Sequence, residues 1–199
     1  GESVISNFSM EVMRGDKIAV IGNNGMGKTT LVRMLAGDLA PDSGEVIVGH
    51  NIDLAYFPQE HADIVDKKQP STLFDWLKAK KPDSYEQEVR SVLGKLLFPG
   101  DDAFKSIANL SGGETARMIL ASLMLVNQNT LILDEPNNHL DLESVSALGW
   151  GLEDYKGTVI CAAHDRDLID NFATRIVSIE DDGIHVFDGG LEEYLAHKG

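Results

Sequence analysis

One stretch of the chain carries the groups that proteins use to hold phosphate: Gly22, Asn23, Asn24, Gly25, Met26, Gly27, Lys28, Thr29 and Thr30. It fits the pattern Gly, four residues, Gly-Lys-Thr of the phosphate-binding P-loop. Glycines lack a Cβ, so this backbone can curl and present its N–H groups to phosphate oxygens. We expect Lys28 to reach the β- and γ-phosphates of a nucleotide and the Thr29 hydroxyl to contact Mg²⁺.

The residues on either side of this loop support the same interpretation. Residues 17–21 are a short apolar run with β-branched side chains, as in a buried strand. Residues 31–36 have the apolar spacing of a helix, which Gly37 ends. The loop therefore joins a strand to a helix, whose positive N-terminal end favours anions. A glycine-rich turn with a chance Gly-Lys-Thr is the alternative, and the flanking elements disfavour it.

Two adjacent carboxylates form a second candidate group. Residues 131–133 are apolar and read as a strand that ends at Asp134 and Glu135. Asp134 is placed to hold Mg²⁺, directly or through water. Glu135 can orient and activate an attacking water as a general base. A helix N-terminus rich in acids is the ordinary alternative, but the upstream P-loop favours catalysis.

The elements that must position these groups alternate between strands and helices. The apolar patterns predict strands at residues 4–12, 17–21, 45–48, 53–57, 130–133, 158–162, 174–179 and 184–187. The fold class is therefore α/β, with a mostly parallel sheet covered on both faces and antiparallel edge strands. In such sheets chemistry gathers at the carboxyl ends of the strands, where the P-loop, Asp134 and His164 are expected.

Between Gln59 and the strand that ends at Asp134, the apolar pattern becomes helical. Helices are expected from residue 71, from about 85 to 97 and from about 111 to 126, which together suggest a helical subdomain at about 68–126. Further helices are expected at about 141–155, with Asp141 as its N-cap, at 167–173 and at 191–198. We expect residues 1–199 to form one domain.

Composition and charge limit the classes of function. With 199 residues, 43% apolar and 25% charged, the chain can build one globular core. A net charge of −15 argues against wide contact with a nucleic-acid backbone. No apolar run is long enough to cross a bilayer, and no N-terminal signal is visible. The single cysteine, Cys161, lies in an apolar run, so we expect a core residue and a cytoplasmic protein.

A further motif brings a family into view. The run Leu110, Ser111, Gly112, Gly113 and Glu114 matches the signature motif of ABC-type ATPases. The P-loop, Gln59, the signature, Asp134-Glu135 and His164 occur in that family's order and approximate spacing. The resemblance covers essentially the whole chain. It implies the P-loop NTPase fold of an ABC ATPase domain, with ATP and Mg²⁺ as its ligands.

Within that family the chain resembles the ABC-F subfamily. Residues 134–141, Asp-Glu-Pro-Asn-Asn-His-Leu-Asp, look like a stretch typical of ABC-F proteins, and residues 97–104 and 187–194 are similar too. The helical insertion is more loosely similar to the second, C-terminal ATPase domain of YbiT-like members. ABC-F proteins carry two such domains and no membrane domain, and characterised members act on ribosomes through a linker. This chain would be one domain without that linker.

Two other functions stay open at this level. The first is the ATP-binding subunit of an ABC membrane transporter, which the ABC-F-like stretches disfavour. The second is a binding module without catalysis. Because Glu135 is present, the sequence gives no reason to infer a catalytically dead domain. The expected activity is therefore hydrolysis of ATP to ADP and phosphate.

The resemblance also implies roles for particular residues. Gln59 would sense Mg²⁺ and the attacking water, and His164 would bond the γ-phosphate from the far side. Ser111 and Gly113 would contact a γ-phosphate bound to a partner domain, because two such domains sandwich two nucleotides head to tail. That partner is a second domain of the full chain or a second copy. Asp141 would lie at the seam between them. Taken alone, Gln59 and His164 would be ordinary loop or surface residues.

Two positions depart from the subfamily pattern. Asn137 stands where Thr is usual, and Ala163 where Ser often precedes the histidine. Neither change removes a catalytic group, so we expect at most altered rates.

The base of the nucleotide lacks an expected partner. The family stacks adenine on an aromatic residue just upstream of its first strand, whereas the first aromatic here, Phe8, lies inside that expected strand. We therefore expect weak ATP binding through the phosphates, with little preference over GTP. Competition between the two nucleotides in a binding titration measures this. Tight binding with a strong preference for ATP would contradict it.

Overall fold

A computed structural model describes residues 5–60, 64–126, 128–138 and 140–198. In this part of the chain, six strands form one sheet in the order β2-β3-β4-β1-β5-β6. Their bounds are β1 (Lys17–Gly22), β2 (Leu54–Phe57), β3 (Thr130–Asp134), β4 (Thr158–Ala162), β5 (Arg175–Glu180) and β6 (Gly183–Asp188). All neighbours are parallel except β5 and β6, which form an antiparallel hairpin at one edge. The α/β fold class is confirmed.

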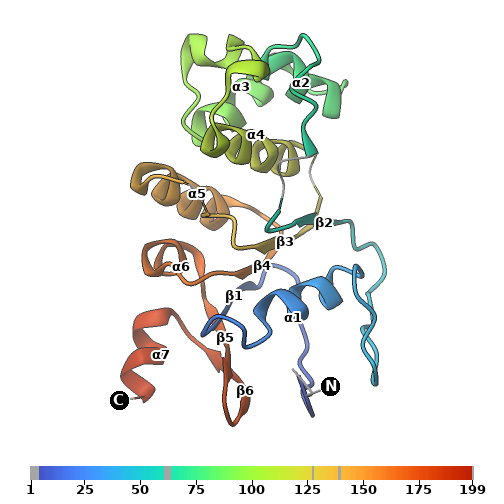
Figure 1. The fold of residues 1–199 in the computed structure, drawn as a ribbon, viewed down its shortest axis with the longest axis vertical. Helices are drawn as coiled ribbons and strands as arrows, with labels where there is room; N and C mark the ends of the chain where they lie inside the picture. The colour runs from blue at the N-terminus through green and yellow to red at the C-terminus, as the bar shows by residue number, and fades with distance from the viewer. Residues whose placement is uncertain (1–4, 61–63, 127, 139, 199) are drawn as a thin grey trace.

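Helices cover both faces of this sheet (Figure 1). Helix α1 (Lys28–Leu35) lies on one face, and α5 (Leu142–Asp154), α6 (Arg166–Phe172) and α7 (Leu191–Lys198) lie on the other. A separate group of helices stacks beyond the β2 edge: α2 (Leu73–Lys80), α3 (Glu86–Lys95) and α4 (Gly112–Leu125), with the short 3₁₀ helices η2 (Gly100–Phe104) and η3 (Ile107–Asn109). No described helix is both long and apolar enough to cross a membrane.

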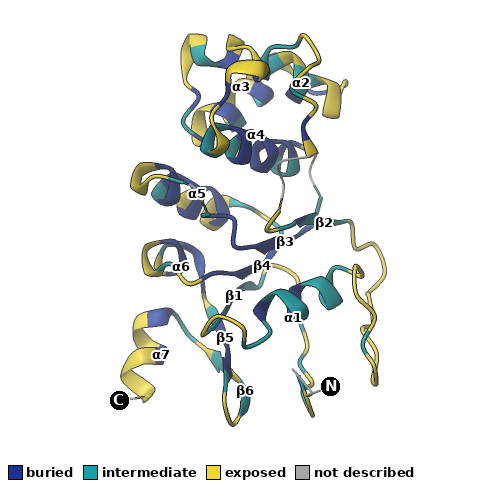
Figure 2. Cartoon of the chain, in the orientation of Figure 1, coloured by how far each residue is buried: buried dark blue, intermediate teal, exposed yellow. Residues whose placement is uncertain are grey.

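Alternation along the strands divides the core in two. On β1, Ile18 and Val20 pack with Leu31 and Val32 of α1, whereas Ala19 belongs to the larger cluster on the opposite face. Strands β3 and β4 are buried along their whole length (Figure 2). Strands buried on both faces are typical of parallel sheets, and the candidate groups follow the carboxyl ends of these strands.

Most expected elements form, and several local predictions hold. Asp141 is the N-cap of α5 and accepts a hydrogen bond from the Ser144 N–H at 2.8 Å. Cys161 is fully buried, and burial raises the pKa of its thiol. The cysteine is therefore a core residue, as its apolar neighbours predict.

Two predicted strands are wrong. Residues 5–12 and 45–48 carry no strand, although apolar residues alternate loosely in the first and are consecutive in the second. Residue 4, where the first predicted strand begins, lies outside the described residues. Residues of the first stretch, Phe8 among them, pack against the core on the α1 side without joining the sheet. In the second, Ile47 leaves 81% of its surface exposed. A strand needs a ladder of backbone hydrogen bonds to a neighbouring strand, and none of the strand pairs in the described residues includes either stretch.

Candidate nucleotide site

The candidate groups meet at the carboxyl edge of three adjacent strands. Parallel pairing places Val20 of β1 and Asp134 of β3 on either side of Ala162 at the end of β4. The P-loop follows β1, Glu135 follows β3, and His164 follows β4. Residues that lie far apart in the sequence are therefore brought to one edge, as the strand pattern predicts.

The P-loop begins in a tightly packed conformation. Gly22 has a φ of +149°, and a Cβ at this position would lie 2.6 Å from the Ile179 carbonyl oxygen on β5. Gly27, the residue before α1, has a φ of +105° in the left-handed region that side chains disfavour. These two glycines let the backbone turn sharply from the strand into the helix. Lys28 then occupies the first helical position.

Lys28 lies buried within this loop. Its Nζ donates to the Gly22 carbonyl at 2.9 Å and to the Asn23 carbonyl at 3.4 Å. It also lies 3.7 Å from Glu135 Oε1. An ammonium group held at the mouth of a P-loop is positioned to bind phosphate oxygens.

Thr29 and Asp134 offer oxygen atoms suited to a hard divalent cation. The Thr29 hydroxyl donates to Asp134 Oδ1 at 3.2 Å, which joins the start of α1 to the end of β3. Asp134 is 0% exposed, and among the described residues its Oδ2 has no hydrogen-bond partner. Burial raises the pKa of this carboxyl group. A buried carboxylate with an unpaired oxygen beside a hydroxyl fits Mg²⁺, which prefers oxygen ligands.

Glu135 connects the three strand ends. Its N–H donates to the Ala162 carbonyl at 2.9 Å, and its backbone has a φ of +50°, unusual for a residue with a side chain. Its Oε2 lies 2.6 Å from His164 Nδ1, while Oε1 faces Lys28. His164 is 55% exposed at its side chain, so this group opens to solvent.

Gln59 lies at the same edge, whereas the signature lies elsewhere. Pairing of Phe57 with Leu133 places the residues after β2 beside those after β3, and Gln59 is exposed there. The signature begins α4, among the helices beyond the β2 edge (Figure 1). Ser111 caps α4, accepting from the Glu114 N–H at 3.1 Å and donating its own N–H to Glu114 Oε2 at 2.9 Å. Ser111 is exposed at this end of the helix.

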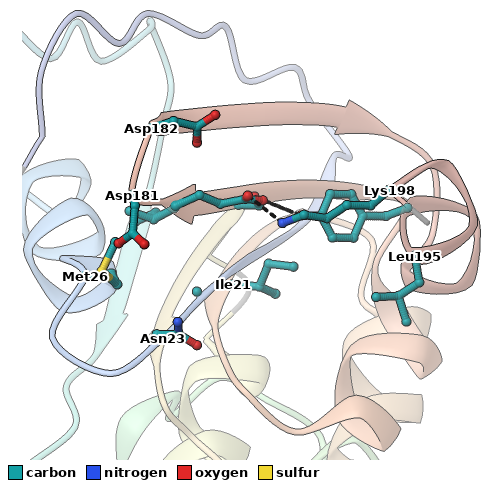
Figure 3. Close-up of a pocket in the computed structure, with 12 residues that line it drawn as sticks. Ile21, Asn23, Met26, Asp181, Asp182, Leu195 and Lys198 are labelled. Carbon is teal, nitrogen blue, oxygen red and sulfur yellow. Dashed lines mark hydrogen bonds and ion pairs between the residues drawn. The ribbon is translucent and has the colours of Figure 1, made fainter.

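A hollow of about 450 Å³ lies on the other side of the P-loop, between Asn23, the β5–β6 turn and α7 (Figure 3). Its charged lining is mainly acidic, with Glu180, Asp181 and Asp182. Lys198 is paired with Glu180, whose Oε2 lies 2.5 Å from its Nζ. The contact with Lys198, together with hydrogen bonds from Ser178 and Tyr194, lowers the pKa of Glu180 to about 2. Because like charges repel, this hollow is unsuited to a triphosphate, and the loop itself stays the candidate phosphate site.

The sequence did not predict how these groups pair with one another. The motifs predict separate roles for Lys28, Glu135 and His164. That Lys28 and His164 both contact the Glu135 carboxylate depends on side-chain rotamers, which the sequence pattern does not specify. Asn137, which departs from the subfamily pattern, is buried, and its Oδ1 has no hydrogen-bond partner in the described part of the chain. His139 of the same stretch lies outside the described residues.

Comparisons with known proteins agree with this geometry. A family model described as ABC transporter matches residues 5–138. The chain is 43% identical over 197 residues to the probable ATP-binding protein YbiT of Escherichia coli O157:H7, covering 98% of this chain and 37% of that protein. It is 42% identical over 196 residues to the ATP-binding protein Uup of Haemophilus influenzae, covering 96% and 30%. The chain thus spans about a third of the length of these curated relatives.

A solved structure is similar over almost the whole chain. It is the archaeal ribosome recycling factor aABCE1 in complex with the ribosomal stalk protein aP1, with a TM-score of 0.74 and 27% identity. The match covers 92% of this chain and 37% of that one. The curated relatives confirm the ABC-F resemblance that the motifs indicate. Since the family model matches more than half of its residues, the chain belongs to the ABC transporter family of ATP-binding domains.

Proposed function

We propose that this chain is the second, C-terminal ATPase domain of an ABC-F protein and hydrolyses ATP to ADP and phosphate. The observation that carries the proposal is the convergence of Lys28, Asp134, Glu135 and His164 at one edge of the sheet. Lys28 and Thr29 come from the loop that binds phosphate, and the carboxylates come from the strand that faces it. These are the parts that phosphoryl transfer to water requires.

In the proposed reaction, water attacks the γ-phosphorus in line and the bond to the bridging oxygen of ADP breaks. Glu135 orients that water and accepts its proton at a carboxylate oxygen. Lys28 and the N–H groups of the loop stabilise the charge that develops on the phosphate oxygens. His164 bonds the γ-phosphate from the far side of the loop. Mg²⁺, held by Thr29 and Asp134 with Gln59 nearby, would supply charge neutralisation.

The site is proposed to be completed by a partner domain. We treat residues 68–126 as a helical subdomain that presents the signature outward. Its Ser111 and Gly113 stand at the N-terminal end of a 14-residue helix, which favours an anion. In a head-to-tail pair this anion is the γ-phosphate bound by the other domain. Asp141, exposed at the start of α5, would lie at the seam.

The cellular role is proposed to involve the ribosome. The similar solved structure is a ribosome recycling factor bound to a ribosomal stalk protein. Because the net charge of this chain is −15, we place the RNA contacts outside its residues, on a linker or another domain. In this scheme ATP binding closes two domains, and hydrolysis opens them again in the cytoplasm.

Complementation between two inactive variants tests the head-to-tail site. Lys28→Met removes the phosphate-binding ammonium, and Ser111→Arg obstructs the signature. In a mixed pair one site carries both changes and the other carries neither. We expect each variant alone to be inactive, and an equal mixture to recover about a quarter of the wild-type rate, since half of the pairs are mixed and each has one intact site.

Protein concentration gives the matching control. The wild-type rate per domain should climb with concentration, and its average mass in solution should rise toward that of a dimer when ATP is added. A mixture of Lys28→Met with Glu153→Gln, a change at an exposed carboxylate of α5, sets the rate expected when only one partner is altered. A mixture of Lys28→Met and Ser111→Arg that stays inactive at concentrations where the wild type turns over would contradict the proposal.

A further inference from the structure

Two segments that lie far apart in the sequence run antiparallel beside each other among the α2–α4 helices. Residues 67–73 follow Gln59, and residues 105–110 precede Ser111. The Leu73 N–H donates to the Lys105 carbonyl at 2.9 Å, and the Ile107 N–H donates to the Ser71 carbonyl at 3.1 Å. Between these two bonds, residues 72 and 106 form an antiparallel bridge. We call this pair of segments the 67–73/105–110 ribbon.

Lys67 makes the last contact of this ribbon, at the end that leads toward both Gln59 and Ser111. Its Nζ donates to the Leu110 carbonyl at 2.7 Å. Leu110 directly precedes Ser111, the N-cap of α4, so its carbonyl lies outside that helix. A hydrogen bond from an ammonium is shorter and stronger than one between neutral groups. The contact therefore fixes the backbone immediately before the signature.

Buried apolar side chains hold the backbone on both sides of this hydrogen bond. Val65, two residues before Lys67, and Leu110 are each 5% exposed and belong to the same apolar cluster. Lys67 itself is half-buried, whereas its neighbour Lys68 is exposed. Without Lys67, the nearest hydrogen bond between the two segments in the described residues is the one that joins Ile107 to Ser71. The stretch up to Ser111 then loses its tie to residues 64–67, which follow Gln59 along the chain.

We infer that Lys67 is a positioning residue that couples Gln59 to the signature. A displacement of the Gln59 segment toward the nucleotide of its own domain is carried through the Lys67–Leu110 hydrogen bond to Ser111. Ser111 faces the nucleotide of the partner domain. Each site then senses the state of the other, and closure becomes concerted. The inference rests on the proposed function and adds a residue that no motif contains.

Three variants of the full-length protein test this role. Lys67→Met keeps the length of the side chain and removes its charge and donors, Lys67→Arg keeps both, and Lys68→Met is the matched control. Because a charge-assisted hydrogen bond is lost, we expect Lys67→Met to lower kcat for ATP about tenfold, with KM and nucleotide affinity within about twofold. The kcat of Lys67→Arg should stay within about threefold of the wild-type value, and the kcat of Lys68→Met should equal the wild-type value.

Hydrogen exchange separates coupling from a general loss of structure. In the wild type we expect Mg²⁺ and ATP to slow exchange of the amides at residues 110–114 as well as those of the P-loop. In Lys67→Met the change at 110–114 should disappear while the change in the P-loop remains. If this variant does not fold, Lys67→Leu, which likewise has neither the charge nor an N–H donor, takes its place with the same expectation.

The outcomes distinguish this inference from the proposed function. A wild-type protein that does not hydrolyse ATP counts against the proposed function, and hydrogen exchange then decides the role of Lys67. If the wild type turns over and Lys67→Met is as active as Lys68→Met, the coupling role is wrong. It is also wrong if Lys67→Arg is as impaired as Lys67→Met, or if the 110–114 amides of the wild type do not respond to ATP.

Discussion

Glu135→Gln is expected to retain ATP and to lose turnover. The amide can still occupy the space of the carboxylate and hydrogen-bond to His164, but it cannot accept a proton from water. General-base catalysis typically contributes 10²–10⁴-fold, so we expect kcat to fall by about 10²–10³-fold. Nucleotide affinity should stay within about threefold, because Lys28 and the loop N–H groups are unchanged. Steady-state hydrolysis and a binding titration measure the two quantities.

The same variant should accumulate the closed pair. If hydrolysis is the step that reopens two domains, a variant that binds ATP without cleaving it stays paired. Mass in solution with ATP and Mg²⁺ should therefore shift further toward the dimer than in wild type. Glu153→Gln, which removes an exposed carboxylate of α5, is the matched control and should behave as wild type. Normal turnover by Glu135→Gln would remove Glu135 from the mechanism.

Asp134→Asn is expected to change stability and activity in opposite directions. The carboxylate is fully buried, its Oδ2 has no partner in the described structure, and burial raises its pKa. An amide in its place has no charge to desolvate and still accepts the hydrogen bond from Thr29. We expect the nucleotide-free protein to gain about 1 kcal/mol in free energy of unfolding at neutral pH. Denaturant titration at fixed pH measures this gain.

The pH dependence of that gain follows from the direction of the shift. A carboxyl whose pKa is raised on folding stabilises the fold when protonated, and this contribution is lost as pH rises through the folded pKa. The advantage of Asp134→Asn should therefore be present at neutral pH and vanish below the ordinary value of 3.8. If Asp134→Asn and the wild type had the same free energy of unfolding at every pH, burial of the Asp134 charge would not be destabilising.

Activity should respond in the other direction. Loss of the negative charge weakens the site proposed for Mg²⁺, so we expect hydrolysis at saturating ATP to drop at least about a hundredfold. Asp101→Asn, a change at an exposed carboxylate, should leave both properties unaltered. If Asp134→Asn hydrolyses ATP at the wild-type rate with unchanged dependence on Mg²⁺, Asp134 does not hold the metal.

Much of the fold was predictable because the central strands and their connections are locally consistent. The runs that became β3 and β4 are apolar throughout, and Asp141 caps its helix as its residue type suggests. The predicted strands that do not form, at residues 5–12 and 45–48, depend instead on pairing with a neighbour, which a short apolar pattern does not specify. Whether β3 and β4 form can be judged from local sequence, whereas whether the other two stretches form strands depends on tertiary contacts.

The candidate site divides along the same line. Motif spacing predicted that the P-loop, Asp134-Glu135 and His164 would share one edge, because parallel strands bring their carboxyl ends together. It did not predict that Lys28 and His164 would both contact Glu135, or that Lys67 would bond to Leu110. Those contacts join residues more than 20 positions apart through flexible side chains, and sequence spacing carries no information about them.

The left-handed backbone of Glu135 has a consequence for laboratory evolution. A side chain at a φ of +50° costs about 1 kcal/mol relative to glycine, which adopts this conformation freely. A library of variants selected only for thermal stability would therefore accumulate glycine or asparagine at position 135. The selected variants would fold and express well but would not hydrolyse ATP. Retention of glutamate at this position would show that the selection acted on turnover as well as on the fold.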